Sequence, residues 1–287
     1  MITGKILIGI TSKNRATILP KAISSGISQL YFNKEIAVFD DNSSDDTKLL
    51  LNQFPEITWF FSENPKGYLY ARNQFLKNTD AEYFCSLDDD SWFLDNTTLI
   101  QAVDFMNNNK SVGALAFDIL TPDSPNGCFL TDEIKESNNF IGCGHMLRVD
   151  AVKKVGYYTP NPGFYGVEEK DLCLRLIDKG YSIMRFPHVK IWHEKSNISR
   201  DLKKQHRSGV CNDFVFMWRR TPAIYLFPAI LNKLYSNATF PFRYKNIKFF
   251  LPFLQGIYDF INALVSNKIN RDPVSKKGLI KFLKLNK

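Results

Sequence analysis

The chain has 287 residues, of which 44% are hydrophobic and 23% are charged. These proportions are ordinary for a globular protein, and the length allows a sizeable core in one large domain or in one domain with an appendage. The formal net charge of +8 favours an anionic partner such as a nucleotide or a membrane surface, and charge alone is weak support for nucleic-acid binding.

Short apolar runs of strand length alternate with helical spacings of apolar residues. Strands are predicted at residues 5–10, 35–39, 57–61, 83–87, 112–117, 141–147, 181–186 and 189–192. Helices are predicted at residues 16–30, 49–54, 69–78, 99–106, 148–155 and 167–180. This alternation predicts an α/β fold with a mostly parallel central sheet flanked by helices, in which ligands bind at the carboxyl ends of the strands.

Polar clusters follow three of the predicted strands, at residues 11–15, 40–46 and 88–90. The first cluster contains neither the G-x-G-x-x-G pattern of a dinucleotide site nor the pattern of a P-loop. A nucleotide site of another kind is therefore favoured. The alternative is that these are the polar loops found at the strand ends of any α/β protein.

The third cluster consists of three consecutive carboxylates, Asp88, Asp89 and Asp90, between apolar residues on both sides. Neighbouring like charges repel, so the cluster is costly unless a positive group lies on it. Carboxylate oxygens suit a hard cation such as Mg²⁺ or Mn²⁺, held together with the phosphates of a substrate. An acidic loop that caps the following helix is the alternative interpretation.

The second half of the chain carries two long loops and another acidic segment. Residues 118–139 form a polar loop whose length predicts a lid or a mobile segment. Residues 157–166 form an aromatic loop rich in Pro and Gly. Glu168 and Glu169 open the next helix, where acidic residues interact favourably with the helix dipole even without any other role.

The last 80 or so residues are rich in aromatic, Leu, Lys and Arg residues. No apolar run among them approaches the roughly 18–20 residues of a membrane span. Residues 249–265 predict an amphipathic helix with basic residues on both flanks. Two interpretations stay open, namely a helix that lies on an anionic membrane and a helix that packs on the rest of the chain or on a partner.

The five cysteines are odd in number and form no C-x-x-C pair, which argues against a disulfide framework or a zinc site. The N-terminus leads directly into a strand and lacks the features of a signal peptide. Both observations predict a cytoplasmic protein. Its basic, amphipathic C-terminal region would also allow it to bind peripherally to the inner face of the cell membrane.

Six segments, in order, resemble the motifs of the family 2 glycosyltransferases with the GT-A fold. They are residues 8–15, 38–47, 64–67 with 71–73, 87–90, 168–175 and 192–193. The resemblance covers roughly residues 4–195. It implies a GT-A catalytic domain over residues 1–200 and leaves residues 201–287 as a mainly helical, basic and amphipathic appendage.

The resemblance also implies a nucleotide-diphosphate sugar as donor, Mn²⁺ or Mg²⁺ as cofactor and inversion at the anomeric carbon. We expect a UDP-sugar, with a dTDP-sugar as the alternative, and a hydroxyl of a glycan or a lipid-linked acceptor. The residues implied to bind the nucleotide sugar are Thr11, Asn14, Arg15, Asp40, Asp41, Gly67, Arg72, Asp88 and Asp89. Asp40 matches the carboxylate that binds the nucleotide base, and Asp41 takes its place if the alignment is shifted by one residue.

For the metal, the resemblance implies direct contact by Asp90, with Asp88 and His193 as further ligands. Glu169 matches the catalytic base, at a position where the family commonly has Asp. Glu has one more methylene and can remove a proton in the same way, and Glu168 and Asp171 are the alternatives.

The leading hypothesis is thus a metal-dependent inverting glycosyltransferase of cell-surface polysaccharide synthesis. A sugar nucleotidyltransferase is disfavoured, because those enzymes usually have a Gly-rich basic loop after the first strand. A third hypothesis is a non-catalytic module that binds a glycan or a membrane, and the intact acidic residues count against it.

Overall fold

The computed structural model describes residues 3–195, 201–243 and 246–285. Within them one mixed sheet forms, with strand order β3-β2-β1-β4-β8-β6-β9-β5 and with β7 paired to β9. The strands are β1 (Ile6–Ser12), β2 (Lys34–Asp40), β3 (Thr58–Phe61), β4 (Tyr83–Asp88), β5 (Ser91–Phe93), β6 (Val112–Leu120), β7 (Lys135–Ser137), β8 (Gly144–Arg148) and β9 (Ser182–His193). The predicted α/β fold is confirmed, although β8, β5 and β7 run antiparallel to their neighbours.

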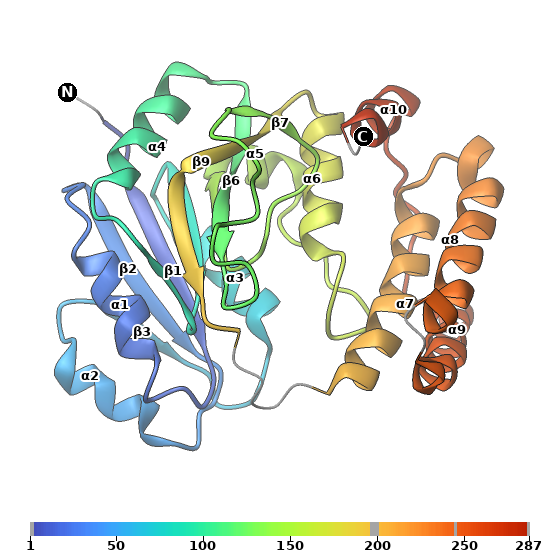
Figure 1. The fold of residues 1–287 in the computed structure, drawn as a ribbon, viewed down its shortest axis with the longest axis horizontal. Coiled ribbons are helices and arrows are strands. Elements are labelled where there is room, and N and C mark those ends of the chain that lie inside the picture. Colours follow the sequence, from blue (N-terminus) through green and yellow to red (C-terminus); the bar gives the residue numbers. More distant parts are fainter. Residues whose placement is uncertain (1–2, 196–200, 244–245, 286–287) are drawn as a thin grey trace.

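Helices cover both faces of this sheet (Figure 1). The helices that precede residue 200 are α1 (Leu19–Ile27), α2 (Leu50–Gln53, after a 3₁₀ turn at Asp46–Leu49), α3 (Tyr68–Asn78), α4 (Thr98–Asn108), α5 (Val149–Val155) and α6 (Glu168–Asp178). Alternate residues of β1 enter two separate apolar clusters, Ile6 and Ile8 on one face and Leu7 on the other. A central strand buried on both faces explains why its sequence is continuously apolar.

The parallel pairing of β1 with β2 and β4 brings three predicted polar clusters together. Ser12 lies opposite Asp40 across one pair, and Thr11 lies opposite Asp88 across the other. The loops that follow these strands therefore leave the sheet at the same edge, as expected for a ligand site of an α/β protein.

Two predictions about strands were incomplete. The runs at 181–186 and 189–192 form a single strand, β9, whose pairing with β6 shifts between Phe117 and Asp118 because β9 bulges at residues 187–189. Strand β5 was not predicted, and it pairs antiparallel with β9 so that Ser91 lies opposite His193. The predicted loop 118–139 is shorter than expected, because β6 extends to Leu120 and β7 lies within it.

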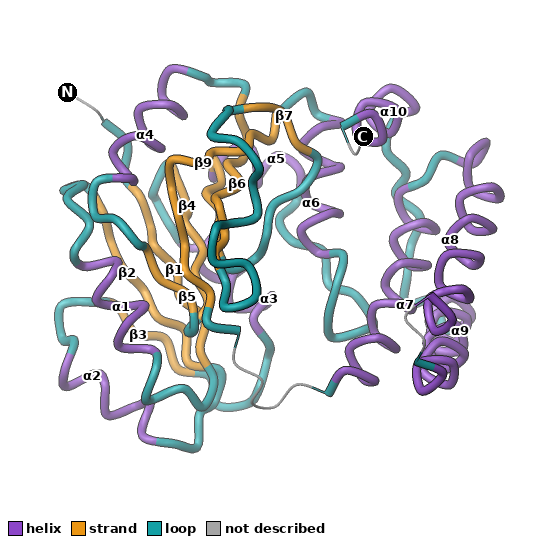
Figure 2. Tube along the Cα trace, viewed as in Figure 1, coloured by secondary structure: helices purple, strands orange, loops and turns teal. Residues whose placement is uncertain are grey.

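The C-terminal region is helical, as predicted, and it lies to one side of the sheet (Figure 2). It comprises α7 (Leu202–Arg220), α8 (Ala223–Arg243), a 3₁₀ turn η2 (Ile247–Phe249), α9 (Phe250–Val265) and α10 (Lys276–Lys284). Helix α10 returns to the sheet domain and adds Leu279 and Phe282 to one of its apolar clusters. The predicted boundary at residue 200 stays a prediction.

The predicted amphipathic helix is present as α9. Its Phe253 and Ala263 are buried in small clusters with side chains of α7, whereas Leu251, Tyr258 and Val265 are exposed. One face of α9 thus packs within the chain, and another is open. None of the helices in the described part of the chain has the length and hydropathy that a membrane crossing requires. All five cysteines are free thiols.

Candidate active site

A cavity of about 630 Å³ lies at the edge of the sheet where β1 and β4 end. The predicted site residues that line it are Thr11, Arg15, Asp41, Gly67, Arg72, Asp88, Asp89, Asp90, Glu168, Glu169 and His193. They come from six segments that are far apart in the sequence. The cavity is large enough for a nucleotide-sized ligand, since such pockets hold roughly 300–1,000 Å³.

The three carboxylates occupy the tight connection between β4 and β5. The Ser91 hydroxyl accepts the backbone N–H of Asp88 at 2.8 Å and so fixes this turn. Asp89 accepts the backbone N–H of Lys13 at 3.2 Å, and its Oδ1 lies 3.6 Å from Arg15 Nε. Burial and the neighbouring carboxylates raise the pKa of Asp89 to about 7, although Arg15 acts in the opposite direction. The cluster is therefore electrostatically costly as it stands, which is the expected state of a site that receives a cation.

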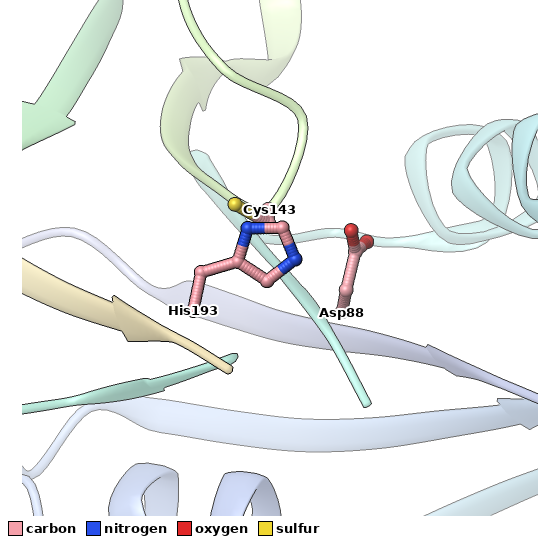
Figure 3. A group of neighbouring side chains, drawn as sticks. All are labelled: Asp88, Cys143 and His193. Carbon is pink, nitrogen blue, oxygen red and sulfur yellow. The ribbon is translucent and has the colours of Figure 1, made fainter. Parts of the chain in front are cut away.

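A group of possible metal ligands lies beside this turn. Asp88, Cys143 and His193 each place one ligand atom within 4.8 Å of the others (Figure 3). His193 Nε2 also lies 3.3 Å from Asp90 Oδ1, a contact made possible by the pairing of β5 with β9. The carboxylate oxygens fit Mn²⁺ or Mg²⁺, whereas an imidazole nitrogen is more typical of zinc, copper, iron and nickel sites. Burial raises the pKa of the Cys143 thiol well above its ordinary value, so this side chain lines the group as a neutral thiol.

Arg72 joins the acidic turn to the predicted catalytic base. Its buried guanidinium donates to Asp88 Oδ1 at 2.9 Å and to the Gly142 carbonyl at 2.9 Å. The other terminal nitrogen donates to Glu169 Oε1 at 3.3 Å. The guanidinium also lies over the ring of Tyr68, 5.0 Å from its centroid. One buried cation therefore fixes the position of Glu169 relative to the carboxylates of the β4–β5 turn.

Glu169 and Glu168 begin α6 at the wall of the cavity. Burial, followed by the charge of Glu168, raises the pKa of Glu169 to about 7, although Arg72 acts in the opposite direction. A carboxylate with a pKa near neutrality is well suited to general base catalysis, because it is available at physiological pH and still holds a proton strongly. Glu168 accepts a short hydrogen bond from the Tyr68 hydroxyl, so its position is also fixed.

Three of the predicted site residues do not line the cavity. Asp171, the second alternative base, is buried on another face of α6 and pairs with Arg220 at 2.5 Å and Arg175 at 2.8 Å. These two cations hold the pKa of Asp171 below its ordinary value in spite of its burial, so its carboxylate is a poor base. Asp171 is also absent from the residues that line the cavity. Asp171 has the role of an ionic link between α6 and α7.

The other two residues support the loops at the sheet edge. Asp40 is fully buried at the end of β2 and accepts the backbone N–H of Ser43 at 3.0 Å. Asn14 accepts the backbone N–H of Ser44 at 2.7 Å. Asp41, the alternative in the sequence analysis, is the residue that lines the cavity, and it accepts the backbone N–H of Lys66 at 2.6 Å. The register shifted by one residue is therefore the one that the geometry favours.

Sequence reasoning did not assign Tyr68, Gly142 and Cys143 to the site, although all three line the cavity. A Cβ atom at Gly142 would lie 2.4 Å from Glu169 Oε1 and 3.0 Å from the guanidinium of Arg72. A side chain at position 142 would therefore displace the carboxylate of Glu169 from the place where Arg72 holds it. The glycines at 142 and 144 were a signal of close packing in the sequence, whereas nothing in the sequence indicated Tyr68.

Comparison with known proteins identifies the family of the chain. Residues 7–156 match the model of the family described as glycosyl transferase family 2. The chain belongs to this family. Residues 131–199 also match a model described as the N-terminal domain of galactosyltransferase, a segment that contains Glu168, Glu169 and His193.

A curated relative of this family 2 glycosyltransferase is an Escherichia coli protein named UDP-Glc:alpha-D-GlcNAc-diphosphoundecaprenol beta-1,3-glucosyltransferase WfgD. It is 30% identical over 142 residues, which span 48% of this chain and 56% of the relative. The chain therefore matches little more than half the length of that relative.

Solved structures identify the fold as GT-A. S. aureus TarS residues 1–349 in complex with UDP-GlcNAc superposes with a TM-score of 0.65 at 16% identity, covering 90% of this chain and 81% of that one. The mannosyltransferase PcManGT from Pyrobaculum calidifontis, in complex with GDP-Man and Mn²⁺, has a TM-score of 0.61 at 12% identity, with coverages of 98% and 79%.

Proposed function

We propose that this protein transfers a sugar from a UDP-sugar to a hydroxyl group of a lipid-linked glycan, with a divalent cation and with inversion at the anomeric carbon. The observation that carries the proposal is the shared cavity of the acidic β4–β5 turn and Glu169, linked by Arg72. The E. coli relative is named for a UDP-glucose donor and a diphosphoundecaprenol acceptor, and TarS forms a complex with UDP-GlcNAc, which favours UDP over dTDP and a diphospholipid acceptor.

Asp90, Asp88 and His193 would hold Mn²⁺ or Mg²⁺ in this proposal. A bound divalent cation would stabilise the negative charge that develops on the diphosphate leaving group. Arg15 and Lys13 also line the cavity and add positive charge on the side of β1. Asp41 would contact the nucleotide.

Glu169 would act as the general base. Its carboxylate removes the proton from the acceptor hydroxyl while the oxygen attacks the anomeric carbon from the side opposite the leaving diphosphate. The result is inversion in a single displacement, through a transition state with oxocarbenium character. Arg72 keeps the carboxylate oriented, and Gly142 leaves the space that this orientation needs.

A lipid-linked acceptor places the enzyme at a membrane surface, and the C-terminal helices support this part of the proposal. Large apolar side chains are exposed along α8 and α9: Ile224, Phe227, Leu231, Tyr235, Leu251, Tyr258 and Val265. Arg243, Lys248 and Lys268 are exposed near the same helices. An apolar surface with basic neighbours is complementary to an anionic bilayer surface. A cytoplasmic protein on the inner face of the cell membrane stays our prediction for localisation.

The test is a transfer assay with a panel of UDP-sugars, Mn²⁺ and an α-D-GlcNAc-diphosphate that carries an alkyl chain. We expect mass spectrometry to find the acceptor enlarged by one sugar, with about 10²–10⁴-fold slower transfer by Glu169→Gln, the range that a general base contributes. Transfer at the unchanged rate by Glu169→Gln would contradict the assignment. Formation of pyrophosphate from a nucleoside triphosphate and a sugar phosphate would establish the nucleotidyltransferase alternative instead.

A further inference from the structure

A second cavity, of about 470 Å³, adjoins the candidate active site and shares Tyr165 and Gly166 with it. One face of α7 forms its floor. The residues of this face follow helical spacing and are Leu202, Gln205, His206, Gly209, Val210 and Asp213. Asn237 and Phe240 of α8 and Phe249 of η2 also line the cavity, which we name the α7 groove.

Gly209 lies inside the 19-residue helix α7. Glycine in a helix interior is less favourable than alanine by roughly 1 kcal/mol, and the usual compensation is close packing against another segment. A Cβ atom at Gly209 would meet no atom of the described residues within 4 Å. The packing of the chain therefore does not require glycine here, and the space above it belongs to the groove.

Gly209 also lies where the two cavities meet. A Cβ atom on Gly166, which lines both cavities, would lie 3.7 Å from the Cα of Gly209. Neither glycine places a side chain at the junction between the α7 groove and the candidate active site, which Tyr165 also lines. Any side chain at position 209 would narrow this junction.

The walls of the groove combine aromatic rings with polar groups. The His206 ring stacks on Phe240, with centroids 4.8 Å apart, and lies 5.1 Å from the ring of Phe249. His206 Nε2 and Asn237 Nδ2 are buried and have no hydrogen-bond partner among the described residues. Buried polar atoms of this kind are costly unless a ligand or a water molecule pairs with them.

We propose that the α7 groove is the acceptor subsite and that it holds a sugar ring of the glycan acceptor, whose attacking hydroxyl passes Gly166 and Gly209 to reach Glu169. The proposal rests on the proposed glycosyltransferase function. Aromatic faces with a few hydrogen-bonding groups suit a pyranose, which presents apolar C–H faces and hydroxyl edges. The groove is also continuous with α8, whose outer side chains form part of the exposed apolar surface, so the lipid of the same acceptor would lie on that side.

The test uses binding, which does not depend on turnover. The probe is α-D-GlcNAc-diphosphate with a hexyl chain, and its affinity is measured by calorimetry for the wild type, Gly209→Ala and Gly209→Leu. We expect the affinity for the probe to fall from the wild type to Gly209→Ala and further to Gly209→Leu, for which the loss should be at least tenfold. The affinity for UDP with Mn²⁺ should not change, and the melting temperature should be equal or higher because both substitutions favour the helix.

The matched control is Lys203→Leu, which places the same side chain on an exposed position of α7 outside the groove. Equal affinity of the probe for the wild type and Gly209→Leu would overturn the proposal. If the wild type bound hexyl diphosphate, which lacks the sugar, as tightly as it binds the probe, the assignment of the groove to a sugar ring would be overturned. Failure of the proposed function would be seen separately, as an absence of UDP binding and of transfer by the wild type.

Discussion

At the scale of single residues, Arg72 explains how the candidate site is held together. Its guanidinium is almost fully buried, and such a group is retained only where acceptors satisfy its charge. Asp88, Glu169 and the Gly142 carbonyl are those acceptors. Arg72 is therefore expected to position the base and the metal-binding turn relative to each other.

The first prediction concerns the pH dependence of transfer. Glu169 must be ionised to accept a proton, and its pKa is raised to about 7. The rate at low acceptor concentration should therefore rise tenfold per pH unit below about 7 and become constant above it. Glu169→Asp, which introduces the residue that is usual in the family, should keep this shape at a lower rate. A rate that is constant from pH 5.5 to 8 would contradict the role of Glu169.

The second prediction concerns stability. Because the pKa of Glu169 in the folded chain lies above the ordinary value of 4.5, folding favours the protonated form. This contribution to stability is complete below about pH 4.5 and is lost as the pH rises through about 7. At pH 8, Glu169→Gln should therefore melt at a higher temperature than the wild type. Its unfolding free energy should be larger by up to ~3 kcal/mol, since one pKa unit corresponds to about 1.4 kcal/mol. The difference in unfolding free energy between Glu169→Gln and the wild type should shrink towards pH 5. An equal difference at pH 5 and pH 8 would contradict the raised pKa of Glu169.

The family resemblance named half of the residues that line the cavity, and the departures from it have physical causes. Adjacent residues at a strand end point in opposite directions, so the pair Asp40 and Asp41 could not be resolved without the register of β2. Asp171 lies on another face of α6 from the cavity, and its partner Arg220 belongs to a region without any recognised motif. No local pattern in the sequence could have revealed that pairing.

At the scale of elements, the strand pairings determine which residues meet. The short strand β5 was not predicted because three residues give no periodicity. Its antiparallel pairing with β9 is what brings His193 to Asp90. The sequence suggested this meeting only through the family resemblance.

The third prediction concerns the link between α6 and α7. Arg220 and Asp171 are both buried, and Arg175 also pairs with Asp171, so removing Arg220 leaves the carboxylate with one of its two cations. Arg220→Ala should therefore lower the unfolding free energy by about 1.5–3 kcal/mol, the range for losing hydrogen bonds to a charged group. The matched control is Arg207→Ala, because the pair of Arg207 with Asp259 is partly exposed and should contribute at most about 1 kcal/mol. Equal losses of melting temperature in the two variants would contradict the link.

At the scale of the whole molecule, a GT-A domain and a layer of helices lie side by side (Figure 1). The candidate active site is at the sheet edge, the α7 groove adjoins it, and the exposed apolar side chains of α8 and α9 belong to the helical layer. This order is suited to an acceptor whose glycan reaches the sheet domain while its lipid stays in a membrane.

The fourth prediction tests that orientation. The wild type should float with vesicles of phosphatidylglycerol and phosphatidylcholine and should dissociate as salt is raised, because screening weakens the attraction of the basic residues. Substituting both Phe227 and Leu251 by Asp should abolish flotation. Phe32→Asp is the matched control, since Phe32 is equally exposed but lies in the GT-A domain. If the double variant floated with vesicles to the same extent as the wild type, the proposal that α8 and α9 face the membrane would be contradicted.

We propose above all that the cavity beside the acidic turn binds a nucleotide-diphosphate sugar together with a metal. The most direct measurement is the melting temperature with UDP, dTDP, GDP and CDP, each with and without Mn²⁺, for the wild type and Asp90→Asn. A ligand that binds only the folded chain raises the melting temperature by mass action. We predict strong stabilisation of the wild type by UDP that requires Mn²⁺ and is lost in Asp90→Asn. The absence of stabilisation by every nucleotide, with and without the metal, would contradict the claim.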